Sequence, residues 1–332
     1  MKKRLLAMLM TGAMVASLAA CAGGDTQKDG GAKAGTTSGC SVDVILKTTA
    51  SEYWSYVKAG AEAYSKDNPD VKVEVKGATS ETAYDEQQNM IETDLNSGAY
   101  DAFVIAPLQA DLVKTLIAGQ TAPIVAVDTN IDAPEVLSFV GTGNEDAAAE
   151  GGKAAVEAAK AAGWDKVQAI AISGVQGDGT ATARLTGYEK GVTEAGGEFL
   201  KDEIQYADAV ADKAATSMEA IMQNHPEGVA IIVCNNDDMA MAAARAAQGH
   251  DAYKNTIFLG FNGDRAACEA ILDGQMTMSV AQMAYEMGYK AVETMVQVLD
   301  GETVDEFVDS GSDVVTPDNA QERLDTLKTQ LH

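Results

Sequence analysis

Two neighbouring aromatic residues, Tyr53 and Trp54, follow the apolar run Val42–Leu46, and Lys47 stands directly after that run. Aromatic rings bind apolar C–H faces, while polar side chains placed around them hydrogen-bond to hydroxyl groups. Further hydrogen-bonding side chains follow other apolar runs: Asp128, Arg184, Asn236, Asn262 and Gln282. Recognition of a neutral polyol needs this combination of rings, carboxylates, amides and a guanidinium.

The elements that must position these side chains alternate along the chain. Continuous apolar, β-branched runs predict strands at Val42–Leu46, Val71–Val75, Ala102–Ile105, Ile124–Val127, Val167–Ile172, Val229–Val233, Ile257–Leu259 and Met276–Ala281. Amphipathic patterns between them predict helices at Tyr53–Ser65, Tyr84–Ser97, Leu112–Ala118, Asp146–Ala162, Ala181–Ala195, Ala209–Asn224, Met239–Gln248 and Arg265–Leu272. This alternation indicates parallel sheets covered on both faces, a doubly wound α/β fold. Ligands of such sheets lie beyond the carboxyl ends of the strands.

Composition limits the classes of partner. The 332 residues suggest about two domains, and the net charge of −26, from 24 Lys and Arg against 50 Asp and Glu, argues against nucleic acid. The same acidity argues against electrostatic attachment to anionic lipid. Three His leave little material for a histidine metal site, and four Cys are too few for a disulfide scaffold. No metal and no cofactor are therefore expected.

The N-terminus has the pattern of an export signal. The basic Lys2–Arg4 precede a short apolar stretch, Leu5–Leu18, which is too short for an ordinary membrane span. It ends in Leu18-Ala19-Ala20-Cys21, which resembles the lipobox of bacterial lipoproteins. That resemblance implies a signal peptide over residues 1–20 and a lipid on Cys21; an ordinary secretory cleavage site with an incidental Cys is the alternative.

Residues 21–40 are expected to form a flexible tether, because residues 22–39 contain no large apolar side chain and are rich in Gly, Ala and Thr. The domain is therefore expected to work outside the cytoplasm, at a membrane surface. Cys40, Cys234 and Cys268 remain after lipidation. Their odd number predicts at least one free thiol, and Cys234 and Cys268 are expected to fill core space.

The spacing of the relevant residues argues against nucleotide-binding, calcium-binding and hydrolase sites. The run Gly174–Gly179 reads G-x-x-G-x-G rather than the dinucleotide pattern G-x-G-x-x-G. The run that begins at Asp128 starts like a calcium loop but has Ala133 where Gly is needed and Phe139 where the bidentate Glu belongs. No G-x-S-x-G elbow occurs, and the adjacent acids Asp237-Asp238 and Glu145-Asp146 are better placed at helix starts than across a glycosidic bond.

Several motifs together resemble one known family. They are Val44–Thr48 followed by Tyr53-Trp54, Arg184–Tyr188, Asn235–Ala240, Gly260–Gly263 and Val280–Gln282. Their order and spacing over about residues 41–317 are similar to the type 1 periplasmic binding proteins, in the ribose, allose and galactose branch. Lys47, with Trp54 as the second aromatic, is most similar to the allose-type binders.

The resemblance implies a role for each residue. Tyr53 and Trp54 would stack on a sugar, and the hydroxyl groups would bond to Lys47, Asp128, Arg184, Asn236, Asn262 and Gln282. Two departures concern the sugar identity: Ser51 and Glu52 stand where the family has Asn-x-Phe or Asn-Pro-Phe, and Asn262 stands where it has Asp.

Single residues also have ordinary structural interpretations. Tyr53 and Trp54 can begin a helix as core residues, Asp128 can cap a turn, and Asn262 can support the turn at Gly263. Asn236 can be the N-cap of the helix that begins near Asp237. Arg184 stands early in a helix, where a cation gains nothing from the dipole, so either a surface position or a ligand role accounts for it.

The resemblance further implies two α/β lobes joined by three crossovers, near Thr142–Gly143, Gln282–Met283 and Asp309–Ser310. The N-terminal lobe would comprise 41–142 plus 283–309, and the C-terminal lobe 143–282 plus 310–332. The protein would be a monomer and not an enzyme. It would capture a monosaccharide between the lobes and deliver it to an ABC permease. The alternatives are a sensor that presents a sugar or autoinducer-2 to a membrane receptor, and a cell-surface glycoside hydrolase.

Overall fold

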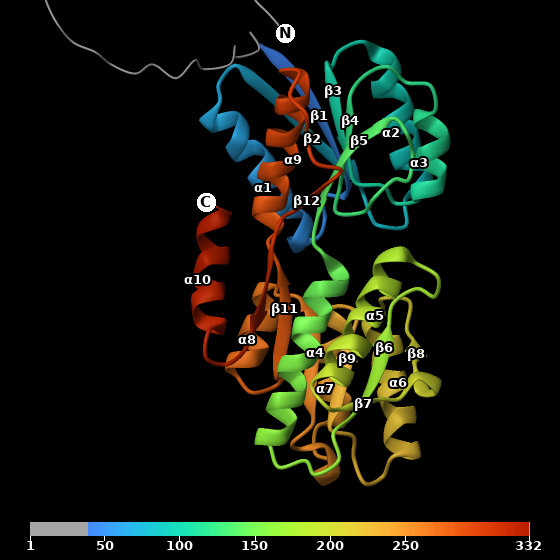
Figure 1. Ribbon diagram of the computed structural model, residues 1–332, viewed down its shortest axis with the longest axis vertical. Helices are drawn as coiled ribbons and strands as arrows, with labels where there is room; N and C mark the ends of the chain where they lie inside the picture. Colours follow the sequence, from blue (N-terminus) through green and yellow to red (C-terminus); the bar gives the residue numbers. More distant parts are fainter. Residues whose placement is uncertain (1–38, 332) are drawn as a thin grey trace, which may run out of the picture. The chain divides into compact units, whose positions relative to one another are not determined.

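The computed structural model describes residues 39–331, and these form two parallel-sheet lobes (Figure 1). The predicted signal peptide, Cys21 and most of the tether lie outside the described residues. Among residues 39–331, no helix is both long enough and apolar enough to cross a bilayer.

The first lobe is built on a six-stranded, wholly parallel sheet. Its strands, in spatial order, are β12 (Phe307–Asp309), β5 (Val136–Gly141), β4 (Ile124–Val127), β3 (Ala102–Ile105), β1 (Cys40–Thr48) and β2 (Val71–Ala78). Its helices are α1 (Glu52–Asp67), α2 (Tyr84–Ser97), α3 (Ala110–Ile117) and α9 (Ala284–Leu299). Helices α1 and α9 pack together on one face of the sheet, and α2 and α3 pack on the other around Ile91, Phe103 and Ile117.

The second lobe is built on a seven-stranded sheet. Its strands are β13 (Ser312–Val315), β11 (Met278–Gln282), β10 (Ile257–Asn262), β9 (Ile231–Cys234), β6 (Gln168–Ser173) and β7 (Glu198–Phe199), with β8 (Gln205–Tyr206) also paired to β6. Only β13 is antiparallel to its neighbour among these described strands. Its helices are α4 (Asn144–Ala161), α5 (Gly179–Glu194), α6 (Ala211–Asn224), α7 (Asp237–Ala247), α8 (Arg265–Leu272) and α10 (Ala320–Gln330), and two 3₁₀ turns lie at Lys201–Glu203 and Asp251–Tyr253.

The chain passes between the two sheets three times, as Figure 1 shows between β5 and α4, between β11 and α9, and between β12 and β13. The first and third passages are hydrogen-bonded to each other, because the Ser310 amide donates to the Gly141 carbonyl at 2.8 Å. The Thr142 and Ser310 hydroxyl groups also lie 3.4 Å apart. We retain the lobe boundaries given above as our proposed division of the chain.

The predicted α/β class with two parallel sheets is confirmed, and all eight predicted strands are present, β3 and β4 with the predicted ends and the other six with one or both ends shifted. Five further strands were not predicted: β5, β7, β8, β12 and β13. Strands β7 and β8 have two residues each, too few for a pattern. Strand β5 interrupts its apolar residues with a buried Ser138 and a 43% exposed Leu137, so it lacks the continuous run of a central strand.

Candidate binding site

A cavity of about 560 Å³ lies where the carboxyl ends of the strands of both lobes meet. All eight residues singled out in the sequence line it: Lys47, Tyr53, Trp54, Asp128, Arg184, Asn236, Asn262 and Gln282. The first four lie at or after the ends of first-lobe strands, with Lys47 as the next-to-last residue of β1, and the last four belong to the second lobe. The cavity volume lies within the roughly 300–1,000 Å³ that small-ligand sites occupy.

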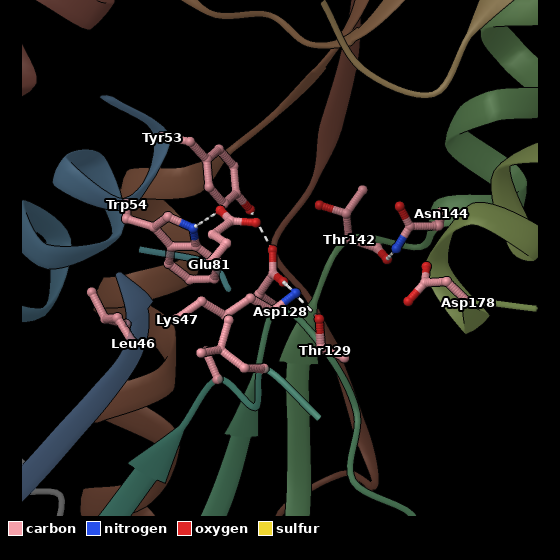
Figure 2. Close-up of polar contacts among 12 residues, drawn as sticks. Leu46, Lys47, Tyr53, Trp54, Glu81, Asp128, Thr129, Thr142, Asn144 and Asp178 are labelled. Atoms are coloured by element: carbon pink, nitrogen blue, oxygen red, sulfur yellow. Dashed lines mark hydrogen bonds and ion pairs between the residues drawn. The ribbon is translucent and has the colours of Figure 1, made fainter. Parts of the chain in front are cut away.

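Helix α1 places the two aromatic residues at the cavity wall. Ser51 is its N-cap, and its hydroxyl accepts a 3.5 Å hydrogen bond from the Trp54 amide. The Tyr53 and Trp54 rings meet edge to face with centroids 5.2 Å apart. Trp54 is only 2% exposed and its indole N–H donates to Glu81 at 2.8 Å (Figure 2). Trp54 is therefore both a core residue and part of the wall, so the two interpretations of this residue are compatible.

Asp128 lies at the centre of a charged and hydroxylated network. It directly follows β4 and has a positive φ of 64°, which turns the chain sharply at the strand end. Its Oδ1 accepts a 2.8 Å hydrogen bond from Tyr53, and its Oδ2 accepts one from Thr129 at 2.8 Å (Figure 2). The Lys47 ammonium lies 3.3 Å from Oδ2.

These partners determine the charge of Asp128. Burial acts to raise its pKa, but the Lys47 ammonium and the Tyr53 and Thr129 hydroxyl groups together hold the pKa of Asp128 below its usual value. Burial and the adjacent carboxylate raise the pKa of Tyr53 well above its usual value. The first-lobe wall thus presents an ionised carboxylate beside a neutral phenol.

Arg184 is buried, at 7% exposure, rather than on the helix surface. Its Nε donates to the Asn144 side-chain oxygen and its Nη1 to the Asn235 carbonyl, each at 2.8 Å. The guanidinium carbon lies 3.8 Å from the centroid of the Phe261 ring, a cation–π stack. Two of the three guanidinium nitrogens are thus hydrogen-bonded to the protein, which fixes the plane of the guanidinium group at the cavity wall.

Asn236 is the N-cap of α7, as one of its two interpretations predicted. Its side-chain oxygen accepts from the Met239 amide at 2.9 Å, and its side-chain amide lies 3.3 Å from the Ala209 carbonyl. The residue lines the cavity at the same time. The cap bond therefore orients the amide group that remains available to a ligand.

Asn262 and Gln282 lie side by side at the ends of β10 and β11. The Gln282 amide donates to the Asn262 side-chain oxygen at 2.8 Å, and the Gln282 oxygen lies 3.5 Å from the Tyr53 hydroxyl of the first lobe. Asn262 has a φ of 127°, and the following Gly263 a φ of 66°. A Cβ at position 263 would lie 2.4 Å from the Ala281 Cβ, so only glycine fits this turn.

Two carboxyl groups stand behind this turn, the buried Asp237 and the half-buried Asp264. The Asp237 carboxylate accepts from the Ser279 hydroxyl at 2.6 Å and from the Asp264 amide at 3.1 Å. Burial raises the pKa of Asp237 to about 6. Burial and the nearby Asp237 raise the pKa of Asp264, which lines the cavity, to about 8. Asp237 is thus a polar core residue, and more than the helix-start acid that the sequence suggested.

Sequence reasoning missed several residues of the wall: Glu81, Asn144, Asp178, Asn235 and Asp264. Glu81 could have been predicted, because it comes three residues after the end of β2, and residues just after parallel strands are expected near a ligand. Asn144 could not have been found in this way, because β5 before it was not predicted.

Among residues 39–331 no group of three or more metal-ligating side chains is close enough to hold a metal ion. Cys40, Cys234 and Cys268 are free and buried, which agrees with the expected free thiol and with Cys234 and Cys268 as core residues. Burial raises the pKa of Cys268 to about 12, so this thiol is protonated and unreactive at neutral pH.

Comparison with known proteins agrees with this geometry. The chain is 31% identical over 216 residues to the ribose import binding protein of Escherichia coli strain K12, covering 64% of this chain and 70% of that protein. It is 28% identical over 263 residues to the D-allose-binding periplasmic protein of the same strain, covering 76% and 82%. The crystal structure of a carbohydrate transporter solute binding protein from Agrobacterium radiobacter, in complex with D-arabinose, has a TM-score of 0.75 and 26% identity, covering 89% of this chain and 99% of that one.

Residues 42–303 match the periplasmic binding protein domain. The relatives are solute-binding proteins, which confirms the expectation that this chain is not an enzyme. The two-lobe α/β architecture, with its cavity at the strand ends of two parallel sheets, is the fold of the type 1 members. The chain therefore belongs to the periplasmic binding protein family, type 1, as an extracytoplasmic solute-binding protein related to ribose- and allose-binding proteins.

Proposed function

We propose that this protein binds a neutral monosaccharide of the ribose or allose type between its lobes and delivers it to an ABC permease. The observation that carries the proposal is the cavity itself. Tyr53 and Trp54 supply apolar ring surface, Asp128 supplies a hydroxyl acceptor, and Arg184 supplies donors in a fixed plane. Hinge closure around the sugar would make all these contacts at once.

The sugar identity belongs to the proposal. Relatives that bind ribose and D-allose support an aldopentose or aldohexose, and a D-arabinose complex supports the same ligand class. Isothermal titration calorimetry against aldopentoses, aldohexoses, inositols and autoinducer-2 tests it. We expect one or a few aldoses to bind with micromolar or tighter affinity and to be recovered unchanged. Failure of every aldose to bind would overturn the proposal, and binding of autoinducer-2 alone would favour a sensor.

We further propose that the mature protein begins at Cys21 and is held at the membrane by a lipid on that residue, with residues 21–40 as the tether. The support is the Leu18-Ala19-Ala20-Cys21 sequence, which lies outside the described residues. Replacement Cys21→Ser should move the protein from the membrane fraction to the soluble fraction, whereas Cys40→Ser should leave it at the membrane. Unchanged fractionation of Cys21→Ser would refute the anchor without affecting the sugar-binding proposal.

A further inference from the structure

A second cavity, of about 530 Å³, adjoins the first. The two share five lining residues: Lys47, Leu108, Asp128, Asp178 and Thr180. Each alone has a volume within the range of small-ligand sites. Together they form a continuous cleft with more room than one sugar ring requires.

An aromatic pair forms part of the second cavity. Phe139 of β5 and Phe307 of β12 are register neighbours in the first sheet, and their rings lie 5.4 Å apart with an interplanar angle of 32°. Phe307 is 44% exposed. Exposed aromatic surface beside polar groups is the combination that binds the C–H face of a sugar.

Polar groups frame this ring pair from both lobes. Figure 2 shows Asp128 and Thr129 of the first lobe facing Asn144 and Asp178 of the second across the cavity, with Thr142 of the first lobe beside Asn144. The Asn144 side chain joins the two cavities: its oxygen accepts from Arg184 at 2.8 Å, and its amide donates to the Thr142 carbonyl at 3.0 Å. Asp128 contacts both cavities through one carboxylate.

The charges of this wall restrict the occupant. Asp128, Glu145, Asp146 and Asp178 line the second cavity, against the single cation Lys47. The Lys47 ammonium is already paired with Asp128 at 3.3 Å. An anionic group, such as a phosphate or a uronate, would meet like charges there. The charges of this wall therefore disfavour an anionic occupant.

We propose that the second cavity is a subsite for a second neutral sugar ring, so that the preferred ligand is a neutral disaccharide. This inference rests on the proposed function of the first cavity. One ring occupies the cavity beside Tyr53 and Arg184, and the second ring lies on Phe307, with the glycosidic bond passing Asp128. Hydroxyl groups of the second ring bond to Thr129 and Asp178.

Calorimetry with one monosaccharide and a panel of its α- and β-linked disaccharides tests the subsite. In the wild type, at least one disaccharide should bind about tenfold or more tightly than the monosaccharide. Phe307→Ala should abolish that preference and leave monosaccharide affinity within about threefold of wild type. Tyr206→Ala is the matched control, because Tyr206 is 42% exposed and lines neither cavity.

The outcomes are distinguishable. Monosaccharide binding with no gain for any disaccharide would overturn the subsite alone, and so would a preference unchanged in Phe307→Ala. A preference lost equally in Tyr206→Ala would also overturn it, because the effect would then be one of folding. If neither sugar class binds the wild type, the proposed function itself fails.

Discussion

The guanidinium of Arg265 in the second lobe bonds to the carboxylate of Glu52 in the first, with Nε 2.5 Å from Oε1. Glu52 begins helix α1 and Arg265 begins helix α8, so this ion pair spans the cleft between the lobes beside the ligand cavity. The same Glu52 oxygen accepts a 2.9 Å hydrogen bond from Tyr56, which holds the carboxylate in place.

Glu52→Gln should weaken sugar binding by up to about fivefold, because a partly exposed ion pair contributes about 0.2–1 kcal/mol. Gln keeps an acceptor for Tyr56 but loses the charge that attracts Arg265. The free variant should also populate a more open arrangement, measured as a larger radius of gyration by small-angle X-ray scattering. Calorimetry at low and high salt should show a weaker salt dependence than in the wild type.

Glu62→Gln is the control for this change, because Glu62 pairs with Lys58 at 3.6 Å within helix α1 and does not reach the other lobe. A double-mutant cycle with Arg265→Gln isolates the pair. If the two substitutions are strictly additive in the free energy of binding, the pair does not couple the lobes.

Trp54 should report ligand binding by its fluorescence. The only other tryptophan, Trp164, lies in a turn of the second lobe and donates its indole N–H to the Asn255 carbonyl at 2.8 Å. Trp164 lines neither cavity. Sugar should therefore change the emission of the Trp164→Phe variant fully and that of the Trp54→Phe variant hardly at all. The reverse result would remove Trp54 from the binding site.

Arg184→Ala should weaken sugar binding about a hundredfold or more. Hydrogen bonds to a charged group contribute about 1.5–3 kcal/mol each, and a micromolar complex has only about 8 kcal/mol in total. The variant also leaves the Asn144 oxygen and the Asn235 carbonyl without their donor. Arg184→Lys should recover little affinity, because an ammonium cannot bond to both acceptors while stacking on Phe261.

Arg245→Ala is the matched control, because Arg245 is an exposed arginine of helix α7 that lines neither of the two cavities. Calorimetry on all variants decides the matter. Affinity of Arg184→Ala within about threefold of wild type would show that the guanidinium does not contact the ligand.

Asp264 should make the free protein less stable as the pH rises. The pKa of Asp264 is about 8 in the folded protein, because of burial first and the nearby Asp237 second, against an ordinary value of 3.8. Between these two values the folded state binds more protons than the unfolded state, so the free energy of unfolding falls with rising pH. Asp264→Asn removes this contribution.

The free energy of unfolding of Asp264→Asn, relative to that of the wild type, should therefore rise between pH 5 and pH 8. The rise should be up to about 1.4 kcal/mol per pH unit. Urea unfolding without ligand at pH 5 and pH 8 measures the gain. Glu269→Gln, which changes an exposed acid of helix α8, the helix that begins directly after Asp264, should follow the wild type. Parallel curves for Asp264→Asn and the wild type would contradict the prediction.

Ligands of parallel sheets lie beyond the carboxyl ends of the strands, and this explains how much of the cavity could be predicted from the sequence. Asp128 follows the continuous apolar run Ile124–Val127, which becomes the central strand β4, and Gln282 directly follows the predicted strand Met276–Ala281, which becomes β11. Asn144 could not be placed in this way, because Ser138 interrupts the apolar residues of β5 and that strand was not predicted. Phe307 was missed because β12 has only three residues, too few for a pattern.

Contacts between residues far apart in the sequence could not be predicted, because no local sequence pattern records them. The bond between Trp54 and Glu81, and the proximity of Asp264 to Asp237, depend on how neighbouring strand ends are placed in three dimensions. The double function of Asn236, as helix cap and cavity residue, was open in the sequence because both functions use the same side chain at the same helix end.

The return of helix α9 and strand β12 to the first sheet has a consequence for how the chain acquires its structure. Gly288 of α9 packs so closely on α1 that an added Cβ would lie 1.9 Å from the Val57 carbonyl oxygen. Residues 40–141 alone therefore lack both the helix that covers one face of their sheet and the strand that completes its edge. Such long-range contacts form slowly, because a long loop must close first. The first lobe to leave the ribosome can thus be completed only after residues 143–282 of the second lobe have been synthesised.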